Sequence, residues 1–340
     1  MIQFEQGFLG DHSLPLVWQI TKDNDASLDK ICAWLSEYKP KIDGLLDKYG
    51  AILLRGFYNI ATGCDFERVI TTIAPNLMDY IGGTSPRKVV YGKVMSATEL
   101  PGNYSIPLHQ EMAYTLYPPE RIAFFCQVPP TSGGDTTIGD MRTITQRIDP
   151  TVRDRFKQKK NLQLRRNLPS KENVDHKPGV PKSWTEVFNT IDRAEVERIV
   201  VKRGWKVEWL PDESMYLWQE VHPAMRTHPR TNDEVWCNQI HLFTPTASLK
   251  WALRDGRHDS VQQMETTLSK NPDLLDQMFY SDGTAVDEND ILHICDLLED
   301  AAVPVRWQRS DVLILDNILA AHGRTAFNGQ RVILTALIRE

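Results

Sequence analysis

The clearest pattern in the chain is a run of apolar residues at helical spacing between positions 26 and 49. Leucine, isoleucine and tryptophan recur every three or four residues there, with charged residues between them, which is typical of an amphipathic helix. Tyr49 and Gly50 end this helix, and residues 51–57 follow as a short apolar strand. A second apolar run, 122–128, lies between two Pro-Pro pairs. Because proline cannot donate to a β-ladder, these prolines predict a strand with sharply defined ends.

The middle of the chain has a different character, with many charges and few strand-like runs. After a turn at Gly133 and Gly134, residues 136–139 are predicted to be extended. Helices are predicted at about 146–160, 184–203, 247–255, 260–280 and 288–299, and extended pieces near 216–218 and 235–243. Near the C-terminus, two apolar runs of strand type occupy 312–315 and 331–338.

Strands at both ends of the chain, with helix-like segments between them, predict one β-sandwich core elaborated by helices. The predicted fold class is therefore mainly β with α insertions. No stretch of the sequence has the composition of a linker between domains. We expect a single domain over residues 1–340, with a largely helical insertion at about 141–300.

Composition and charge narrow the class of protein. The 340 residues include 39 Lys plus Arg and 45 Asp plus Glu, and the resulting net charge of −6 argues against a nucleic-acid partner. No apolar stretch approaches the ~18 residues that a membrane span needs, and the first residues lack the pattern of a secretory signal. The five cysteines are scattered and form no C-x-x-C pair, which disfavours a disulfide framework. We therefore expect a cytoplasmic protein with no membrane partner.

A histidine and a glutamate two residues apart, His109 and Glu111, form the first candidate for chemistry. On a strand, residues two apart point to the same face, so these two side chains would lie together. An imidazole and a carboxylate supply two of the three ligands of a 2-His-1-carboxylate site, which suits non-haem iron(II). The spacing is common, however, and a pair of surface residues on a strand would show the same pattern.

The second candidate lies near the C-terminus, where the strand at 312–315 is followed by His322 and, nine residues later, by Arg331. A histidine just past the end of a buried strand is suited to be a third metal ligand. An arginine on the next strand offers a planar fork of N–H donors to the carboxylate of a cosubstrate. Taken alone, each of these residues also has an ordinary structural interpretation.

Taken together and in order, these segments make the sequence resemble the TauD/TfdA-like iron(II)/2-oxoglutarate oxygenases. Within that family the sequence is most similar to the SyrP-like hydroxylases, which modify amino acids during natural-product assembly. The resemblance implies a double-stranded β-helix (jelly-roll) core of the clavaminate synthase type. It extends over most of the chain, through the segments 49–57, 109–111, 129–136, 222–223, 228–229, 235–239 and 322–331.

The resemblance implies a role for each matching residue. His109, Glu111 and His322 match the iron ligands, which are also the catalytic residues. Arg331 matches the arginine that pairs with a carboxylate of 2-oxoglutarate, and Thr136 matches a threonine whose hydroxyl contacts the same cosubstrate. Most relatives have aspartate where this chain has Glu111, whereas SyrP-like and clavaminate synthase-like members have glutamate. The implied cofactor is Fe(II), with 2-oxoglutarate and O₂ as cosubstrates.

The same matches imply an oxygenase that acts on a small molecule, by analogy an amino acid or a carrier-protein-tethered aminoacyl group in antibiotic or other specialised-metabolite biosynthesis. The arginine that serves the sulfonate in taurine dioxygenase would fall at Thr335, which argues against taurine. Halogenases of the superfamily have a small residue in place of the carboxylate ligand, so Glu111 favours hydroxylation. Desaturation, epoxidation and cyclisation are alternatives within the class. A non-catalytic jelly-roll binding protein and a zinc hydrolase are alternatives outside it, although a zinc hydrolase does not account for Arg331 or Thr136.

Four polar residues are candidates for substrate contact. Asn238 and Gln239 match a segment that the SyrP-like pattern places near the substrate, and a role in tying down backbone fits them equally well. Asn103 and Tyr104 precede the first candidate segment and could line the mouth of the site or simply form a turn.

Four further polar residues have structural interpretations that compete with functional ones. Arg324 could pair with an acid such as Asp316 or contact 2-oxoglutarate. The spacing of His222, His228 and His241 fits no common zinc motif, which favours structural or surface roles for them. Homo-oligomers are common among the relatives, and the sequence leaves the oligomeric state open.

Overall fold

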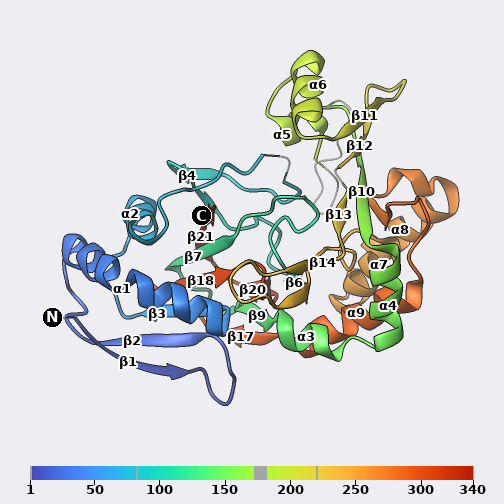
Figure 1. The fold of residues 1–340 in the computed structure, drawn as a ribbon. Helices are drawn as coiled ribbons and strands as arrows, with labels where there is room; N and C mark the ends of the chain where they lie inside the picture. Colours follow the sequence, from blue (N-terminus) through green and yellow to red (C-terminus); the bar gives the residue numbers. More distant parts are fainter. Residues whose placement is uncertain (1, 82, 172–181, 220, 340) are drawn as a thin grey trace.

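The computed structural model describes residues 2–81, 83–171, 182–219 and 221–339. Its largest element is an eight-stranded sheet (Figure 1), in which antiparallel pairs outnumber the single parallel pair. In spatial order, the strands are β1 (Gln3–Phe8), β2 (Leu16–Lys22), β3 (Ala51–Arg55), β18 (Val312–Asp316), β7 (Arg121–Val128), β21 (Val332–Ile338), β5 (Val94–Ser96) and β4 (Val89–Tyr91).

A smaller sheet packs against the inner face of the large one. Its strands, in spatial order, are β17 (Val303–Val305), β9 (Thr136–Asp140), β19 (Ala320–Arg324) and β6 (Ile106–His109). One buried apolar cluster contains Leu53 and Phe124 from the large sheet together with Leu108 and Ile138 from the small sheet. This two-sheet core confirms the mainly-β fold class, and the strands predicted at both ends of the chain all belong to it.

The first helix of the chain covers the outer face of the large sheet. It is α1 (Leu28–Tyr49), and the side chain of Ser27 caps it by accepting a hydrogen bond from the Lys30 amide. The helix ends where Gly50 adopts a φ of 74°, a left-handed conformation that glycine takes without steric cost. The helix predicted at 26–49 is confirmed.

A second helix, α2 (Gly63–Ile73), packs on the same outer face. The residues of β3 alternate between the two faces of the sheet, so that Ile52 and Leu54 contact the helical layer while Leu53 faces the inner core. A strand that is buried on both faces has no solvent side. For that reason its sequence is an unbroken apolar run and not an alternating one.

Between residues 141 and 300 the chain forms helices and two further sheets. A five-stranded sheet contains β10 (Asn161–Leu168), β11 (Lys206–Trp209), β12 (Met215–Trp218), β13 (His222–Pro223) and β16 (Gln277–Tyr280). A two-stranded sheet contains β14 (Met225–Thr227) and β15 (Glu234–Trp236). The helices are α3 (Met141–Arg147), α4 (Pro150–Lys159), α5 (Trp184–Phe188), α6 (Arg193–Lys202), α7 (Pro245–Arg254), α8 (His258–Lys270) and α9 (Glu288–Asp300).

Two of the helices predicted in this region are each two helices. The segment 146–160 is interrupted because Asp149 caps a new helix that begins at Pro150. The segment 184–203 is interrupted where Asn189 ends α5 in a left-handed conformation with a φ of 52°. The helices predicted at 247–255 and 288–299 are confirmed as α7 and α9.

Two other predicted segments have the wrong extent. The helix predicted over 260–280 ends at Lys270, and its last residues form β16, which pairs with β10. That pairing is a long-range contact, so helical spacing along the segment could not reveal it. The extended segment predicted at 235–243 is a strand only in β15, and the chain then turns towards α7.

The helices α5 and α6, with β11 and β12, stand at the top of the view in Figure 1, away from the two main sheets. They enclose a separate small core that includes Trp184, Phe188 and Trp205. No helix among the described residues is long and apolar enough to cross a membrane.

Candidate active site

Two histidines face each other across neighbouring strands of the small sheet. His109 is the last residue of β6, His322 lies in the middle of β19, and the antiparallel register pairs them directly. Their ring centroids are 4.4 Å apart. The sequence placed His322 just past the end of a strand, whereas it lies within β19, a separate strand that follows β18 after a turn.

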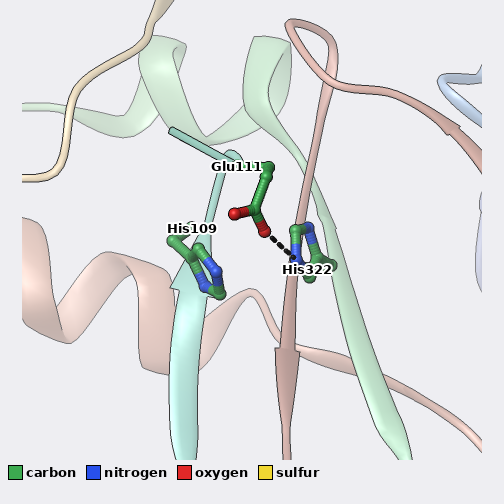
Figure 2. Close-up of side chains that lie close together, drawn as sticks. All are labelled: His109, Glu111 and His322. Carbon is green, nitrogen blue, oxygen red and sulfur yellow. Dashed lines mark ion pairs between the residues drawn. The ribbon is translucent and has the colours of Figure 1, made fainter. Parts of the chain in front are cut away.

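Glu111 completes the group from a turn and not from the strand. Because β6 ends at His109, the expectation that both residues lie on one strand face is wrong, although the turn still brings them together. Figure 2 shows the carboxylate of Glu111 pointing between the two imidazoles, with its Oε2 3.7 Å from His322 Nε2. One potential ligand atom from each of the three residues lies within 4.8 Å of the other two.

A single glycine allows β19 to lie this close to its neighbours. A Cβ added at Gly323 would lie 2.4 Å from the carbonyl oxygen of Ile106 and 2.6 Å from Thr137 Oγ1. Ile106 is on β6 and its contact is a backbone atom, so any side chain at this position must push β6 away, and it must also displace the Thr137 hydroxyl on β9. The site therefore depends on glycine next to His322.

We expect Gly323→Ala to destabilise the protein by about 1–3 kcal/mol, because overpacking forces backbone shifts. The free energy of unfolding in urea measures this effect. Gly7→Ala in β1 is the matched control, since a Cβ there meets no atom within 4 Å. Equal free energies of unfolding for the two variants would contradict the close approach of the strands.

The turn that carries Glu111 is fixed by the side chain of Asn317. The Glu111 amide donates to Asn317 Oδ1 at 2.7 Å. Asn317 Nδ2 donates to the carbonyl oxygens of Glu111 and Pro119, at 2.9 and 2.8 Å. All these groups are buried, so this one amide satisfies three backbone groups that have no water nearby.

We expect Asn317→Ala to lower the free energy of unfolding by about 2–4 kcal/mol, because it leaves buried backbone groups of Glu111 and Pro119 without partners. It should also weaken metal binding, since the Glu111 turn loses its anchor. Urea unfolding and an iron(II) titration measure the two effects. Asn289→Ala, at an exposed position of α9, is the control. A variant as stable as this control would show that the amide network contributes little.

The electrostatics keep His109 available as a neutral ligand and Glu111 available as an anion. Burial, followed by the charge of His322, lowers the pKa of His109 to about 3. Burial alone would raise the pKa of Glu111, but the charge of Arg87 and the contacts with the two histidines outweigh it and lower that pKa. His109 Nδ1 donates to the carbonyl oxygen of Pro107 at 2.9 Å, which leaves the lone pair of Nε2 for a metal.

A small cavity next to the two histidines contains the residues that the sequence assigned to the cosubstrate. Its lining includes His109, His322, Thr136 and Arg331. Arg331 Nε donates to the carbonyl oxygen of Gly134 at 2.9 Å, and its Nη2 lies 3.5 Å from Thr136 Oγ1. Burial, followed by the charge of Arg324, lowers the pKa of Arg331 to about 9. A guanidinium whose charged form is disfavoured by burial is stabilised when it binds an anionic ligand.

The comparison with known proteins identifies the family. The family model described as taurine catabolism dioxygenase TauD, TfdA family matches residues 12–337. The chain belongs to this family. It is therefore an iron(II)/2-oxoglutarate-dependent dioxygenase, and its family membership disfavours the non-catalytic alternative.

Curated relatives and solved structures agree with this placement. The dapdiamide synthesis protein DdaC of Enterobacter agglomerans is 33% identical over 316 residues, covering 93% of this chain and 88% of its own. A clavaminate synthase-like protein of Arabidopsis thaliana is 29% identical over 317 residues, covering 92% and 88%. The narrower likeness to SyrP-like hydroxylases stays a prediction.

Two solved structures show the same fold at low sequence identity. PvcB of Pseudomonas aeruginosa matches with a TM-score of 0.55 and 16% identity, covering 99% of this chain and 91% of that one. AAD-2 in complex with Mn(II) and N-oxalylglycine matches with a TM-score of 0.51 and 13% identity, covering 99% and 97%. The jelly-roll core of the clavaminate synthase type is confirmed.

The side chains of this TauD-family oxygenase fit an iron(II) ion. Two imidazoles and one carboxylate are the donor set of the 2-His-1-carboxylate sites of non-haem iron oxygenases. Glu111 Oε2 and His322 Nε2 are separated by more than a hydrogen-bond length, and His322 Nδ1 is buried with no hydrogen-bond partner among the described residues. The potential ligand atoms of the three side chains therefore lie close together without forming hydrogen bonds to one another.

The residues predicted to contact substrate lie elsewhere. Asn238 Nδ2 donates to the carbonyl oxygen of Ala224, and Gln239 Nε2 donates to that of Gln110. Asn103 is in an exposed turn, and Tyr104 presents its carbonyl oxygen to Arg324. None of the four lines the cavity at the histidines. In this structure Asn238 and Gln239 hold backbone, and their contact with substrate stays a prediction.

Arg324 does not pair with Asp316. Its guanidinium donates to the carbonyl oxygens of Thr98, Leu100, Pro101 and Tyr104, and it borders the cavity. Asp316 instead accepts hydrogen bonds from His228 Nε2 at 2.9 Å and from Arg230 at 3.0 Å. This ion-paired network gives His228 a structural role, as the sequence favoured.

The other two histidines, His241 and His222, are also buried. His241 Nε2 is 2.8 Å from the carbonyl oxygen of Leu108, so it supports β6 next to His109. Burial lowers the pKa of His241 to about 4, which keeps the ring neutral. His222 is buried in β13.

Sequence reasoning missed two residues of this site. Asn317 lies two residues after the predicted strand 312–315, and an asparagine at the end of a buried strand was a usable signal for a backbone anchor. Arg87, whose Nη2 lies 2.6 Å from Glu111 Oε2, has no comparable signal. It is one of the many arginines of the chain, and it lies in a turn-rich segment.

Proposed function

We propose that this oxygenase hydroxylates an amino acid, either free or held as an aminoacyl group on a carrier protein, in the biosynthesis of a specialised metabolite. The observation that carries the biosynthetic role is the 33% identity, over 93% of the chain, to a protein named for dapdiamide synthesis. Desaturation, epoxidation and cyclisation need the same metal and cosubstrate and are the alternatives within the class.

In this proposal His109, Glu111 and His322 would hold iron(II). The chemistry that bound iron(II) supplies is the reduction of O₂, coupled to decarboxylation of 2-oxoglutarate to succinate and CO₂. Glu111 contributes one negative charge to the site, and the depressed pKa of His109 keeps its imidazole from being protonated at neutral pH. We propose that the whole chain works as one domain, because His109 and His322 are far apart in the sequence and yet meet on neighbouring strands.

Arg331 and Thr136 bind the far carboxylate of 2-oxoglutarate in this proposal. Trp307 Nε1 donates to Thr136 Oγ1 at 3.0 Å, so the threonine oxygen already accepts a hydrogen bond and its proton is free for a ligand carboxylate. Arg331 is anchored through Nε to Gly134, and its side chain lines the same cavity as Thr136. The two side chains thus present convergent donors to one anionic group.

Two measurements test the proposal. Anaerobic addition of iron(II) and 2-oxoglutarate should produce the weak visible charge-transfer band of the chelated cosubstrate. In air, a panel of amino acids and of carrier-bound aminoacyl groups should then be screened for substrate-dependent succinate, with mass spectrometry to detect the gain of one oxygen atom. A missing band would refute the iron and cosubstrate assignment. A product that loses two hydrogens would identify desaturation instead.

A further inference from the structure

The guanidinium of Arg87 lies in the site, and only one of its three nitrogens has a partner among the described residues. Its side chain is 3% exposed, and Nη2 forms an ion pair with Glu111 Oε2 at 2.6 Å. Nε and Nη1 are also buried, and neither has a hydrogen-bond partner among the described residues. Arg87 lines the same cavity as His109 and His322. Two N–H-bearing atoms of a buried cation therefore lie beside the metal ligands without an acceptor.

The loop before Arg87 holds the guanidinium in a fixed place. The guanidinium carbon lies 4.5 Å from the centroid of the Tyr80 ring, a cation–π contact. The Tyr80 hydroxyl accepts a hydrogen bond from the Ser85 amide at 3.0 Å. A Cβ at Gly83 would lie 2.0 Å from the Tyr80 ring, so only glycine lets the ring fold back under the arginine. This preorganisation is typical of a binding group.

A second cation is attached to the same loop. Lys182 Nζ donates to the carbonyl oxygen of Ser85 at 2.8 Å. Burial, followed by the charges of Arg166 and Arg87, lowers the pKa of Lys182, so the basic groups on this side of the site disfavour one another's charges. The residues lining the cavity include Arg87, Arg324 and Arg331 and no acid. An anion entering this cavity is attracted by these three arginines.

A purely structural role for Arg87 accounts for only part of this arrangement. Holding the Glu111 carboxylate uses one nitrogen, and a bound metal would draw on the same carboxylate. The cosubstrate does not explain the remaining donors either, since Arg331 and Thr136 are already placed for its far carboxylate. Leaving buried donors without acceptors costs free energy, so a ligand that satisfies them is favoured.

We propose that Arg87 binds a carboxylate of the substrate. This inference rests on the proposed function and names a chemical class for its substrate, a compound with a free carboxylate. A free amino acid meets this requirement with its α-carboxylate. A carrier-tethered aminoacyl group has a thioester at that position and would need a carboxylate elsewhere.

The test compares carboxylates with their carboxamides as ligands of the protein loaded with Mn(II) and N-oxalylglycine. The probes are the L-amino acids, their N-acyl derivatives and short dicarboxylic acids, each paired with its amide. Binding is followed through the paramagnetic relaxation that Mn(II) causes in the ligand protons. We expect at least one carboxylate to bind the wild type about tenfold or more tightly than its amide, as a charge-assisted pair predicts.

Two variants assign this preference to Arg87. Arg87→Gln should lose the preference because it removes the charge, and Arg87→Lys should lie between Arg87→Gln and the wild type because lysine keeps the charge but not the planar fork. Both variants should keep their affinity for N-oxalylglycine. Arg331→Met is the contrast variant, which should lose N-oxalylglycine affinity instead. If the Arg87 variants lose N-oxalylglycine affinity, Arg87 serves the cosubstrate and the proposal is wrong. If they lose only Mn(II), Arg87 merely holds Glu111 and the proposal is again wrong.

The outcomes also separate this inference from the proposed function. A wild type that fails to bind Mn(II) and N-oxalylglycine would refute the oxygenase site itself. A loaded wild type that binds no carboxylate better than its amide would refute only the role of Arg87, and the oxygenase assignment would stand.

Discussion

Replacing His109 with alanine is expected to abolish iron- and 2-oxoglutarate-dependent succinate formation. The variant loses one of two imidazole ligands, and the remaining pair, His322 and Glu111, cannot hold the metal in a defined geometry. Metal assistance is worth several kcal/mol, so the rate should fall by roughly 10³-fold or more. Succinate assays at saturating iron(II), with the bound iron measured separately, provide the test.

The control for this variant is His12→Ala, which removes an exposed histidine that is far from His109 in the sequence. It should keep both its iron content and its turnover. Circular dichroism should show that His109→Ala retains its fold, because His109 makes a single hydrogen bond with the described residues, to Pro107. Full turnover by a folded His109→Ala protein would refute the ligand assignment.

Replacing Arg331 with methionine is expected to weaken 2-oxoglutarate binding about 10- to 150-fold, since a charge-assisted hydrogen-bonded pair is worth about 1.5–3 kcal/mol. The methionine side chain keeps an apolar stem and removes the charged guanidinium. Metal binding should be unchanged, because Arg331 contacts Gly134 and Thr136 and none of the three ligands. Anaerobic titration of the charge-transfer band measures the dissociation constant.

Two comparisons sharpen the Arg331 result. Arg331→Lys should lie between methionine and the wild type, because lysine keeps the charge but not the planar fork. Arg309→Met changes an exposed arginine and should leave the dissociation constant unchanged. If Arg331→Met binds 2-oxoglutarate as tightly as the wild type, the far carboxylate must sit elsewhere, and Arg324 is the next candidate because it borders the same cavity.

The parts of the fold that could be predicted are those whose pattern is local. The helix α1 has its own cap and its own apolar stripe, and the strands β7 and β18 are continuous apolar runs with clear ends. The strand β16 was missed because its identity depends on pairing with β10, more than a hundred residues earlier. Periodicity along one segment carries no information about such a partner.

The chemistry of the site was in the sequence, whereas its support was not. The order and types of His109, Glu111 and His322, together with Arg331, were enough to indicate an iron(II)/2-oxoglutarate oxygenase, because few other sites need those donors in that combination. Asn238 and Gln239 matched a pattern near the substrate, but the folded chain uses both amides on backbone carbonyl oxygens.

The sequence by itself thus determined which donor groups this protein has, since side-chain chemistry is a property of each residue. Only the tertiary structure decided how they meet. The register between β6 and β19 sets His109 against His322, the turn held by Asn317 aims Glu111 between them, and the loop around Tyr80 brings Arg87 to the same carboxylate. These contacts join different segments of the chain. Strand register and packing create them, and no local sequence pattern encodes either.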